Sequence, residues 1–439
     1  MIRNILISMR NRYITRLILA VAFGASLTAC VSQPSKEPSI ASLSSPSTQR
    51  QFVDHYATMG YATYLDAYDQ AVALQVSIEN FLSLPNQLTL SSARDAWKLA
   101  RVPYSQSEVY RFGNPFVDRW EGQVNAWPVD EGFIDYVDES QYVSGLGNTG
   151  ADLNLLSVDS LSIGGNTVDL RQLDINTLSQ LNEYGGSESN VVTGYHAIEF
   201  LLWGQDLSGP VHGAGNRHFS DYITGPECAN PPCERRASLL RLVTGKLVSD
   251  LNFMQKAWSP YGEYRKRLLE QPEENGLKRM LYGIGSLALG ELAGERLLVA
   301  MEAKSQEDEQ DCFSDHTHSS IFNNALSLHN VYTGTYTNSN GERFQGPNLS
   351  SLVSRLDPSL DEEMKFSLRT NLLRAEEIFL RAEAEQLPES FDMLLAEGNN
   401  EGKQLIQSLI DSLTETTRNI ERITSMLGFT NLSFDDHAG

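Results

Sequence analysis

Apolar residues recur at helical spacing along most of the chain. Six long stretches place apolar side chains three and four positions apart, with little of the alternation that is typical of strands. They cover residues 52–81, 90–110, 234–258, 274–304, 360–384 and 401–427. Pro103 should kink or break the second stretch, because a proline inside a helix removes a backbone hydrogen bond. The pattern predicts an all-α protein.

The segments between these stretches suggest how the chain is divided. Residues 113–170 are rich in Gly, Asn, Asp and Ser and should be irregular, with a helix following over 168–184. Gly185 and Gly186 should end that helix, and Ser189 or Asn190 could cap the next one. Residues 206–232 are rich in Gly and Pro and form the best boundary. We therefore expect two helical-bundle domains, residues 50–215 and 216–430.

The first 49 residues have the composition of an export signal and a tether. Arg3, Arg10, Arg12 and Arg16 precede a short apolar run that ends in Leu27-Thr-Ala-Cys30. This ending resembles a bacterial lipobox, which implies cleavage of residues 1–29 and lipidation of Cys30; the alternative is an ordinary signal cut after Ala29. Residues 30–49 would then be a disordered Ser/Pro-rich tether. No Asp follows Cys30, so we expect an outer-membrane lipoprotein of the bacterial envelope, facing the periplasm or the cell surface.

The net charge limits the kinds of molecule that the protein can bind, and the cysteines suggest a disulfide. The net charge of −22 repels nucleic acid and is compatible with attracting cations, so we expect no nucleic-acid partner. Cys228 and Cys233 flank Ala-Asn-Pro-Pro, and in an oxidising compartment they should form a local disulfide. A metal site is the alternative for this pair, although no further soft ligand stands nearby. Cys312 is left over, either free and buried or paired with an unidentified group.

One apolar run contains two residues that could carry chemistry. In VVTGYHAIEFLLWG, residues 191–204, His196 and Glu199 stand three apart and would share one face of a helix. Burying both is costly unless another group pairs with them. That group could be a side chain or a metal ion.

Five blocks resemble one protein family. Thr193-Gly-Tyr-His-Ala-Ile-Glu199 is similar to the G-x-H-x-x-E signature of the imelysin-like family, and the other four are similar to its iron-regulated protein A branch. These are Arg101-Val-Pro-Tyr-Ser-Gln-Ser-Glu108, Trp120-Glu-Gly-Gln-Val-Asn-Ala-Trp-Pro-Val-Asp-Glu131, Gly213-Ala-Gly-Asn-Arg217 and Cys312-Phe-Ser-Asp-His-Thr-His318. The resemblance spans about residues 50–430. It implies two helical bundles with a cleft between them and a role in iron acquisition; some members are described as peptidases.

The resemblance also implies a metal site. Related iron-uptake proteins bind metal with the His and Glu of this motif and two upstream acids, which fall best on Glu108 and Asp135, with Asp130 competing for the second place. We expect an ion that is most plausibly iron, with zinc or copper as alternatives, bound bare or as a chelate. An envelope iron transporter would be the natural partner. Binding should weaken as the pH falls through the usual histidine range near 6.5.

Catalytic readings have less support. The zinc-peptidase pattern H-E-x-x-H is absent, and the inverted form fails because Phe200 takes the place of the second histidine. A metallopeptidase using His196 and Glu199 is the first alternative. The second is a structural or carbohydrate-binding lipoprotein in which the pair only ties helices together.

A pair of histidines and two arginines could also belong to functional sites. His316-Thr-His318, beside Cys312 and Asp315, looks like a second metal cluster, but we favour a helix start capped by Ser314 or Asp315. Arg101 and Arg217 should pair with the acids of the predicted cleft.

Overall fold

The fold was taken from a computed structural model of the chain. It describes residues 46–142, 147, 148, 150–163, 165–211, 213–303 and 308–430. The described residues belong to one compact unit that spans Leu43–Gly439. The predicted signal peptide, Cys30 and most of the predicted tether lie outside them.

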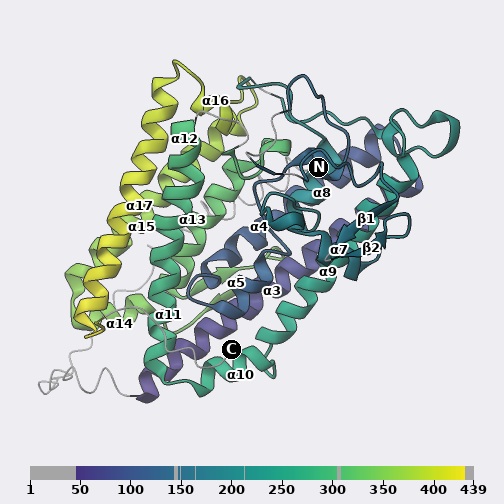
Figure 1. The fold of residues 1–439 in the computed structure, drawn as a ribbon. Coiled ribbons are helices and arrows are strands. Elements are labelled where there is room, and N and C mark those ends of the chain that lie inside the picture. Colours follow the sequence, from purple (N-terminus) through teal and green to yellow (C-terminus); the bar gives the residue numbers. More distant parts are fainter. Residues whose placement is uncertain are drawn as a thin grey trace, which may run out of the picture. The chain divides into compact units, whose positions relative to one another are not determined.

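Long helices dominate the structure, so the predicted all-α fold class is confirmed (Figure 1). Most of the predicted stretches form helices close to the expected bounds. The helices of the first half of the chain are α3 (Pro46–Ser83), α4 (Gln87–Ser107), η1 (Glu108–Tyr110), α5 (Pro115–Glu121), α6 (Glu131–Ile134), α7 (Ile175–Leu181), η2 (Tyr184–Gly186) and α8 (Gly194–Trp203).

The second half continues in the same way. Its helices are η3 (Phe219–Tyr222), η4 (Gly225–Glu227), α9 (Cys233–Trp258), α10 (Glu263–Glu270), α11 (Glu273–Ser286), η5 (Leu287–Leu298, π-helical), α12 (Val299–Ala303), η7 (Cys312–Ser314), α13 (Thr317–Thr333), α14 (Leu349–Leu356), α15 (Pro358–Ala382), α16 (Phe391–Leu395) and α17 (Asn400–Met426). Two small antiparallel hairpins interrupt the helices: β1 (Ser160–Ile163) with β2 (Asn166–Asp169), and β3 (Thr335–Thr337) with β4 (Arg343–Gln345).

The helices pack around two hydrophobic clusters. α3 lies against α4 and α9, whereas α15 lies against α13 and α17 (Figure 1). The first half of α3 and the end of α9 contribute to the cluster around Trp258, while their other halves contribute to the cluster around Trp97. Each cluster therefore draws on residues from both sides of position 215. The predicted division into two domains with a cleft stays a prediction.

Local differences from the sequence prediction have physical causes. Pro103 lies inside α4, which runs on to Ser107 instead of ending at the proline. Pro103 leaves the carbonyl of Leu99, four residues earlier, without its helical donor, and Leu99 is 42% exposed. The helix expected over 168–184 is only the short α7, because residues 166–169 pair in a hairpin. The sequence predicted a helix start at residues 316–318, where α13 begins, but not the extent of that helix.

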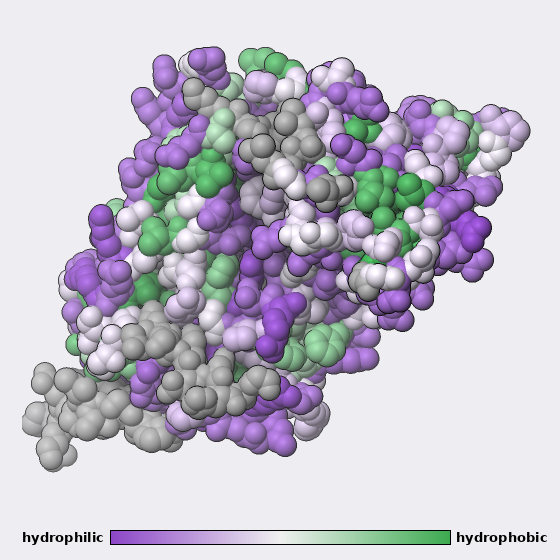
Figure 2. Space-filling view, viewed as in Figure 1, coloured by the Kyte–Doolittle hydropathy of each residue, from purple (hydrophilic) through white to green (hydrophobic). Residues whose placement is uncertain are grey.

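The surface is largely polar. On the face drawn in Figure 2, hydrophilic residues are widespread and apolar residues form separate patches. Among the residues that the structure describes, no helix combines the length and hydropathy that a membrane span requires.

Candidate metal centre

Helix α8 carries His196 and Glu199, and a glycine sets the place where it begins. Gly194 has a φ of +80°, and a Cβ there would lie 2.3 Å from the carbonyl oxygen of Val124. The neighbouring Tyr195 N–H donates to that same oxygen at 2.8 Å. The cap residue is Thr193, whose side chain donates to Asn182 and makes no capping hydrogen bond with the helix, so the predicted cap at Ser189 or Asn190 is wrong. The glycine of the motif thus fixes the helix start against the loop at Val124.

The other end of α8 is also held. Its last turn leaves carbonyl groups without partners inside the helix. The Arg94 guanidinium donates to the carbonyl of Leu202 at 2.9 and 3.1 Å and to that of Arg217 at 2.8 Å. Gly204, with a φ of +71°, ends the helix. A helix of 10 residues is thereby fixed at both ends.

The centre itself is a buried cluster of one imidazole and two carboxylates. Nδ1 of His196 lies 2.9 Å from Oε2 of Glu199, one helical turn away, and 3.8 Å from Oδ1 of Asp311. The side chains of all three are at most 1% exposed. One potential ligand atom from each lies within 4.8 Å of the other two, an arrangement that could hold a metal ion.

Nearby hydroxyl groups orient both carboxylates. Oε1 of Glu199 accepts hydrogen bonds from the N–H of Ser314 at 3.0 Å and from its hydroxyl at 2.6 Å. The Ser320 hydroxyl donates to Oδ2 of Asp311. These bonds leave Oε2 of Glu199 and Oδ1 of Asp311 directed at His196. Nε2 of His196, in contrast, is buried without a hydrogen-bond partner.

A buried arginine balances part of the negative charge. Arg101, on α4, lies 2.9 Å from Oδ1 of Asp311 and donates to the Asn125 side chain at 2.5 Å. Its guanidinium group also lies 5.2 Å from the ring centre of Tyr195 and 5.7 Å from that of Trp97. The prediction that Arg101 pairs with an acid is thus met by Asp311.

Burial shifts the protonation of the cluster. It lowers the pKa of His196 well below 6.5, and the positive charges of Arg101 and Arg296 lower it further. Burial, followed by repulsion from Asp311, raises the pKa of Glu199 well above its usual value. These shifts favour a neutral imidazole, and they favour a protonated Glu199 when no cation is present. The expected weakening of metal binding near pH 6.5 stays a prediction.

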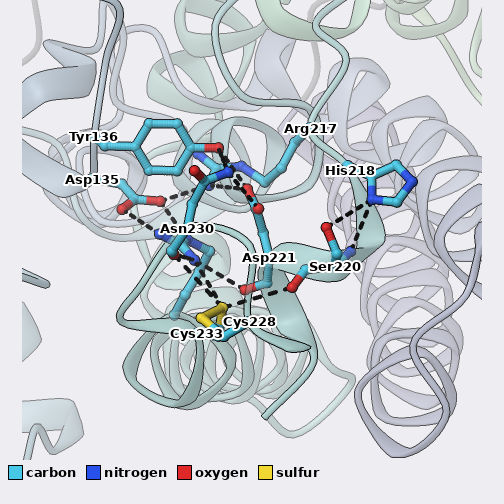
Figure 3. The surroundings of a disulfide bond; sticks show 10 residues. Asp135, Tyr136, Arg217, His218, Ser220, Asp221, Cys228, Asn230 and Cys233 are labelled. Atoms are coloured by element: carbon cyan, nitrogen blue, oxygen red, sulfur yellow. Dashed lines mark hydrogen bonds and ion pairs between the residues drawn. A yellow bond between two sulfur atoms is a disulfide. The ribbon is translucent and has the colours of Figure 1, made fainter. Parts of the chain in front are cut away.

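Asp135 lies in a different network, beside the disulfide that joins Cys228 and Cys233 (Figure 3). Arg236 donates to its two oxygens at 2.6 and 2.9 Å, and Arg217 donates to it at 2.7 Å. Burial raises the pKa of the Asp135 carboxyl, but these two arginines outweigh burial and lower it. A carboxylate held by two buried arginines has its charge already compensated, and it does not join the His196 cluster.

The other two predicted ligands also have separate partners. Glu108, at the end of α4, forms an ion pair with Arg296 of η5 and accepts a hydrogen bond from Asn324 at 3.4 Å. Asp130 accepts hydrogen bonds from the Ser189 hydroxyl at 2.9 Å and from Asn148. Glu108, Asp130 and Asp135 as metal ligands stay predictions, and their contacts favour structural roles.

Asp311 was missed in the sequence. It ends the run Glu307-Asp-Glu-Gln-Asp311, which reads as a solvated acidic stretch. Its only signal was its position directly before the block Cys312–His318, which resembles the family. Its own N–H is bound by the Thr317 hydroxyl at 3.0 Å, so the start of α13 holds it in place. Cys312, also in this block, is buried, and it forms no disulfide with another cysteine that the structure describes.

Together these features define a class: an all-α protein with a fully buried His–Glu–Asp cluster set at one end of a short, doubly anchored helix. Comparison with known proteins gives the family. The family model described as Imelysin matches residues 60–420, so the chain belongs to the imelysin family.

Two relatives carry similar descriptions. "Iron-regulated protein A" of Synechococcus elongatus is 28% identical over 83 residues, which are 19% of this chain and 22% of the relative's length. The crystal structure described as a "putative iron-regulated protein A precursor" from Parabacteroides distasonis has a TM-score of 0.62 at 17% identity. That likeness covers 87% of this chain and 96% of the other, and it shows a shared fold.

Proposed function

We propose that this protein is an envelope-anchored lipoprotein that binds a metal ion through His196, Glu199 and Asp311 and takes part in iron uptake. Iron is the first candidate, with zinc and copper as alternatives. The observation that carries the proposal is a buried imidazole whose Nδ1 is placed against two buried carboxylates. The names of the two relatives support iron.

The geometry suits a small cation. Metal ions of this kind bind nitrogen and carboxylate oxygen at about 2.1 Å, which puts neighbouring ligand atoms about 3 to 4 Å apart. The distances of 2.9 and 3.8 Å from Nδ1 of His196 fall in that range. Mixed imidazole and carboxylate ligands suit iron, zinc or copper better than calcium or magnesium.

The charges of the buried cluster also suit the binding of a cation. Without a cation, Arg101 compensates Asp311 and a proton compensates Glu199. A divalent ion would balance the negative charges of Glu199 and Asp311. The proton on Glu199 would then leave, and Arg101 would either move away or stay paired with one oxygen of Asp311. The Ser314 and Ser320 hydroxyls would continue to orient the two carboxylates.

Location in the envelope rests on the N-terminal sequence and on the disulfide. Cys228 and Cys233 are bonded in the structure, which suits an oxidising compartment. The lipobox at residues 27–30 would attach the chain to the outer membrane. There it could receive iron, bare or chelated, and pass it to an envelope transporter.

Titration calorimetry with Fe²⁺ under anaerobic conditions, Zn²⁺ and Cu²⁺ tests the site. His196→Ala, Glu199→Gln and Asp311→Asn should each weaken binding of the preferred ion at least about tenfold, because each removes one ligand. His218→Ala, at an exposed histidine, should leave binding unchanged. Circular dichroism confirms that each variant is folded.

Two results would overturn the proposal. Equal affinities in the wild type and the three site variants would mean that the cluster is a structural tie between helices. Metal-dependent cleavage of a denatured protein substrate, lost in His196→Ala, would instead establish a metallopeptidase. Elemental analysis of protein purified without chelator identifies the ion.

A further inference from the structure

We propose that His316, His318 and Glu383 form a second metal site, separate from the His196 cluster, for a divalent transition-metal ion. His316 immediately precedes α13, His318 lies in the first turn of that helix, and Glu383 follows the last residue of α15. The site would therefore join the start of one long helix to the end of another. It does not depend on the function proposed above.

The three side chains already have the spacing of ligands. Nε2 of His318 lies 3.0 Å from Oε1 of Glu383. The two imidazole rings have centroids 5.1 Å apart and an interplanar angle of 80°. One nitrogen or oxygen atom from each of the three residues lies within 4.8 Å of the other two.

The ring nitrogens of the cluster have few hydrogen-bond partners. Nδ1 of His318 has none among the described residues, and the ring of His316 has only the backbone of Lys98. His316 is 6% exposed and His318 is 3% exposed. Polar atoms buried in this way cost free energy, typically about 1–3 kcal/mol each, unless something binds them. A cation would supply that partner.

The simpler explanation, a capped helix start, does not account for these residues. α13 does begin at Thr317, but its cap residue is His316, whose side chain accepts no hydrogen bond from the helix. The Ser314 hydroxyl is bound to Glu199, and Oδ2 of Asp315 accepts from the N–H of Gly213 at 3.4 Å. Neither residue caps the helix as the sequence suggested.

The charges around the cluster favour a cation. Lys98 acts on both His316 and Glu383, Arg101 also acts on His316, and both positive groups oppose binding. Against them stands Glu383, whose pKa is lowered chiefly by its hydrogen bond with His318. Burial, together with the electrostatic effect of Asp392 and Asp206, raises the pKa of Asp315, next to His316, to about 7, so a nearby cation would favour the charged form of Asp315.

The donor set indicates the class of ion. Two imidazoles and one carboxylate suit Zn²⁺, Cu²⁺, Co²⁺, Ni²⁺ or Fe²⁺, whereas Mg²⁺ and Ca²⁺ prefer oxygen ligands alone. Three protein ligands leave at least one coordination position for water. The side chain of Glu383 is 38% exposed, so an ion at this site could exchange with solvent.

Equilibrium dialysis of the full chain against Zn²⁺ counts the sites. The His196→Ala variant should still bind one Zn²⁺, and adding His318→Ala should abolish that binding. Glu383→Gln in the same background should weaken binding at least about tenfold. Because Glu383 is partly exposed, this change should leave helix content and melting temperature intact. Glu376→Gln, at an exposed position of α15, is the matched control and should have no effect.

Electron paramagnetic resonance with one equivalent of Cu²⁺ separates the two sites. In His196→Ala, copper held by His316 and His318 should show coupling to two imidazole nitrogens. Copper held by the intact His196 cluster of the wild type would show coupling to only one. A folded His196→Ala protein that binds no Zn²⁺, or that binds it equally well after His318→Ala and Glu383→Gln, would overturn the second site. A fall from two bound Zn²⁺ in the wild type to one in His196→Ala bears only on the first site.

Discussion

A Cβ atom at position 194 would lie 2.3 Å from the carbonyl oxygen of Val124, and this contact explains why the motif begins with glycine. His196 and Glu199 are the proposed metal ligands of the motif, whereas Gly194 allows the helix that carries them to begin where it does. The three residues of the motif therefore have distinct roles, and variants should separate them.

Gly194→Ala should destabilise the protein by about 1–3 kcal/mol, because it combines a left-handed backbone with a steric clash against Val124. Urea denaturation followed by circular dichroism measures the change. Gly245→Ala is the control: Gly245 lies inside α9, and a Cβ there meets nothing closer than 3.7 Å. It should be neutral or stabilising by up to about 1 kcal/mol. Equal losses in the two variants would contradict the role given to Gly194.

Metal binding should release a proton and weaken as the pH falls. The pKa of Glu199 is raised well above its usual value by burial and by Asp311, so the cation-free site holds a proton that must leave before the carboxylate can bind. Below that pKa, affinity should fall about tenfold per pH unit. Calorimetry at one pH in buffers of different ionisation enthalpy measures the proton directly. Glu199→Gln should bind weakly and without proton release; a buffer-independent enthalpy in the wild type would refute the assignment.

Asp135→Asn should cost stability and leave metal affinity unchanged. It leaves Arg217 and Arg236 buried without their shared carboxylate, a change typically worth about 3–5 kcal/mol. Asp169→Asn, which breaks an exposed ion pair with Arg171, should cost less than about 1 kcal/mol. If Asp135→Asn instead weakened metal binding with little loss of stability, the ligand role suggested by the family resemblance would be right.

Asp135 should also change how the stability of the protein depends on pH in acid. The folded protein holds the Asp135 pKa below its unfolded value of about 3.9. Its stabilising contribution is therefore complete above pH 4 and is lost as the pH falls through the folded pKa. The wild type should lose stability more steeply than Asp135→Asn in this range.

Cys30→Ser should release the protein from the membrane. A lipidated Cys30 would hold the chain in the detergent phase after Triton X-114 separation, since several acyl chains anchor firmly. The variant should move to the aqueous phase, and mass spectrometry of the wild type should find acyl groups at Cys30. Unchanged partition with no acyl groups would favour the ordinary signal cut after Ala29.

The sequence predicted the long helices well because their apolar periodicity is set by burial of one face. It predicted the pair His196 and Glu199 because both lie on one turn of one helix. It could not predict Asp311, which lies 112 residues after Glu199 and meets it only through tertiary packing of α8 against η7. It predicted that Arg217 pairs with an acid, but not that Arg236 of α9 shares Asp135 with it, because the two arginines come from different segments of the chain.

The placement of Arg101 has a consequence for what the protein can do after it has bound an ion. Structural zinc sites commonly unfold when they are stripped, because their ligands then repel one another in a buried space. Here a permanently charged side chain stands beside Asp311, and a proton can return to Glu199. In the proposed site, Arg101 and this proton would balance the charges of the two carboxylates when the ion leaves. Such a site would release its ion without leaving two buried carboxylates to repel each other, which suits the reversible binding proposed above.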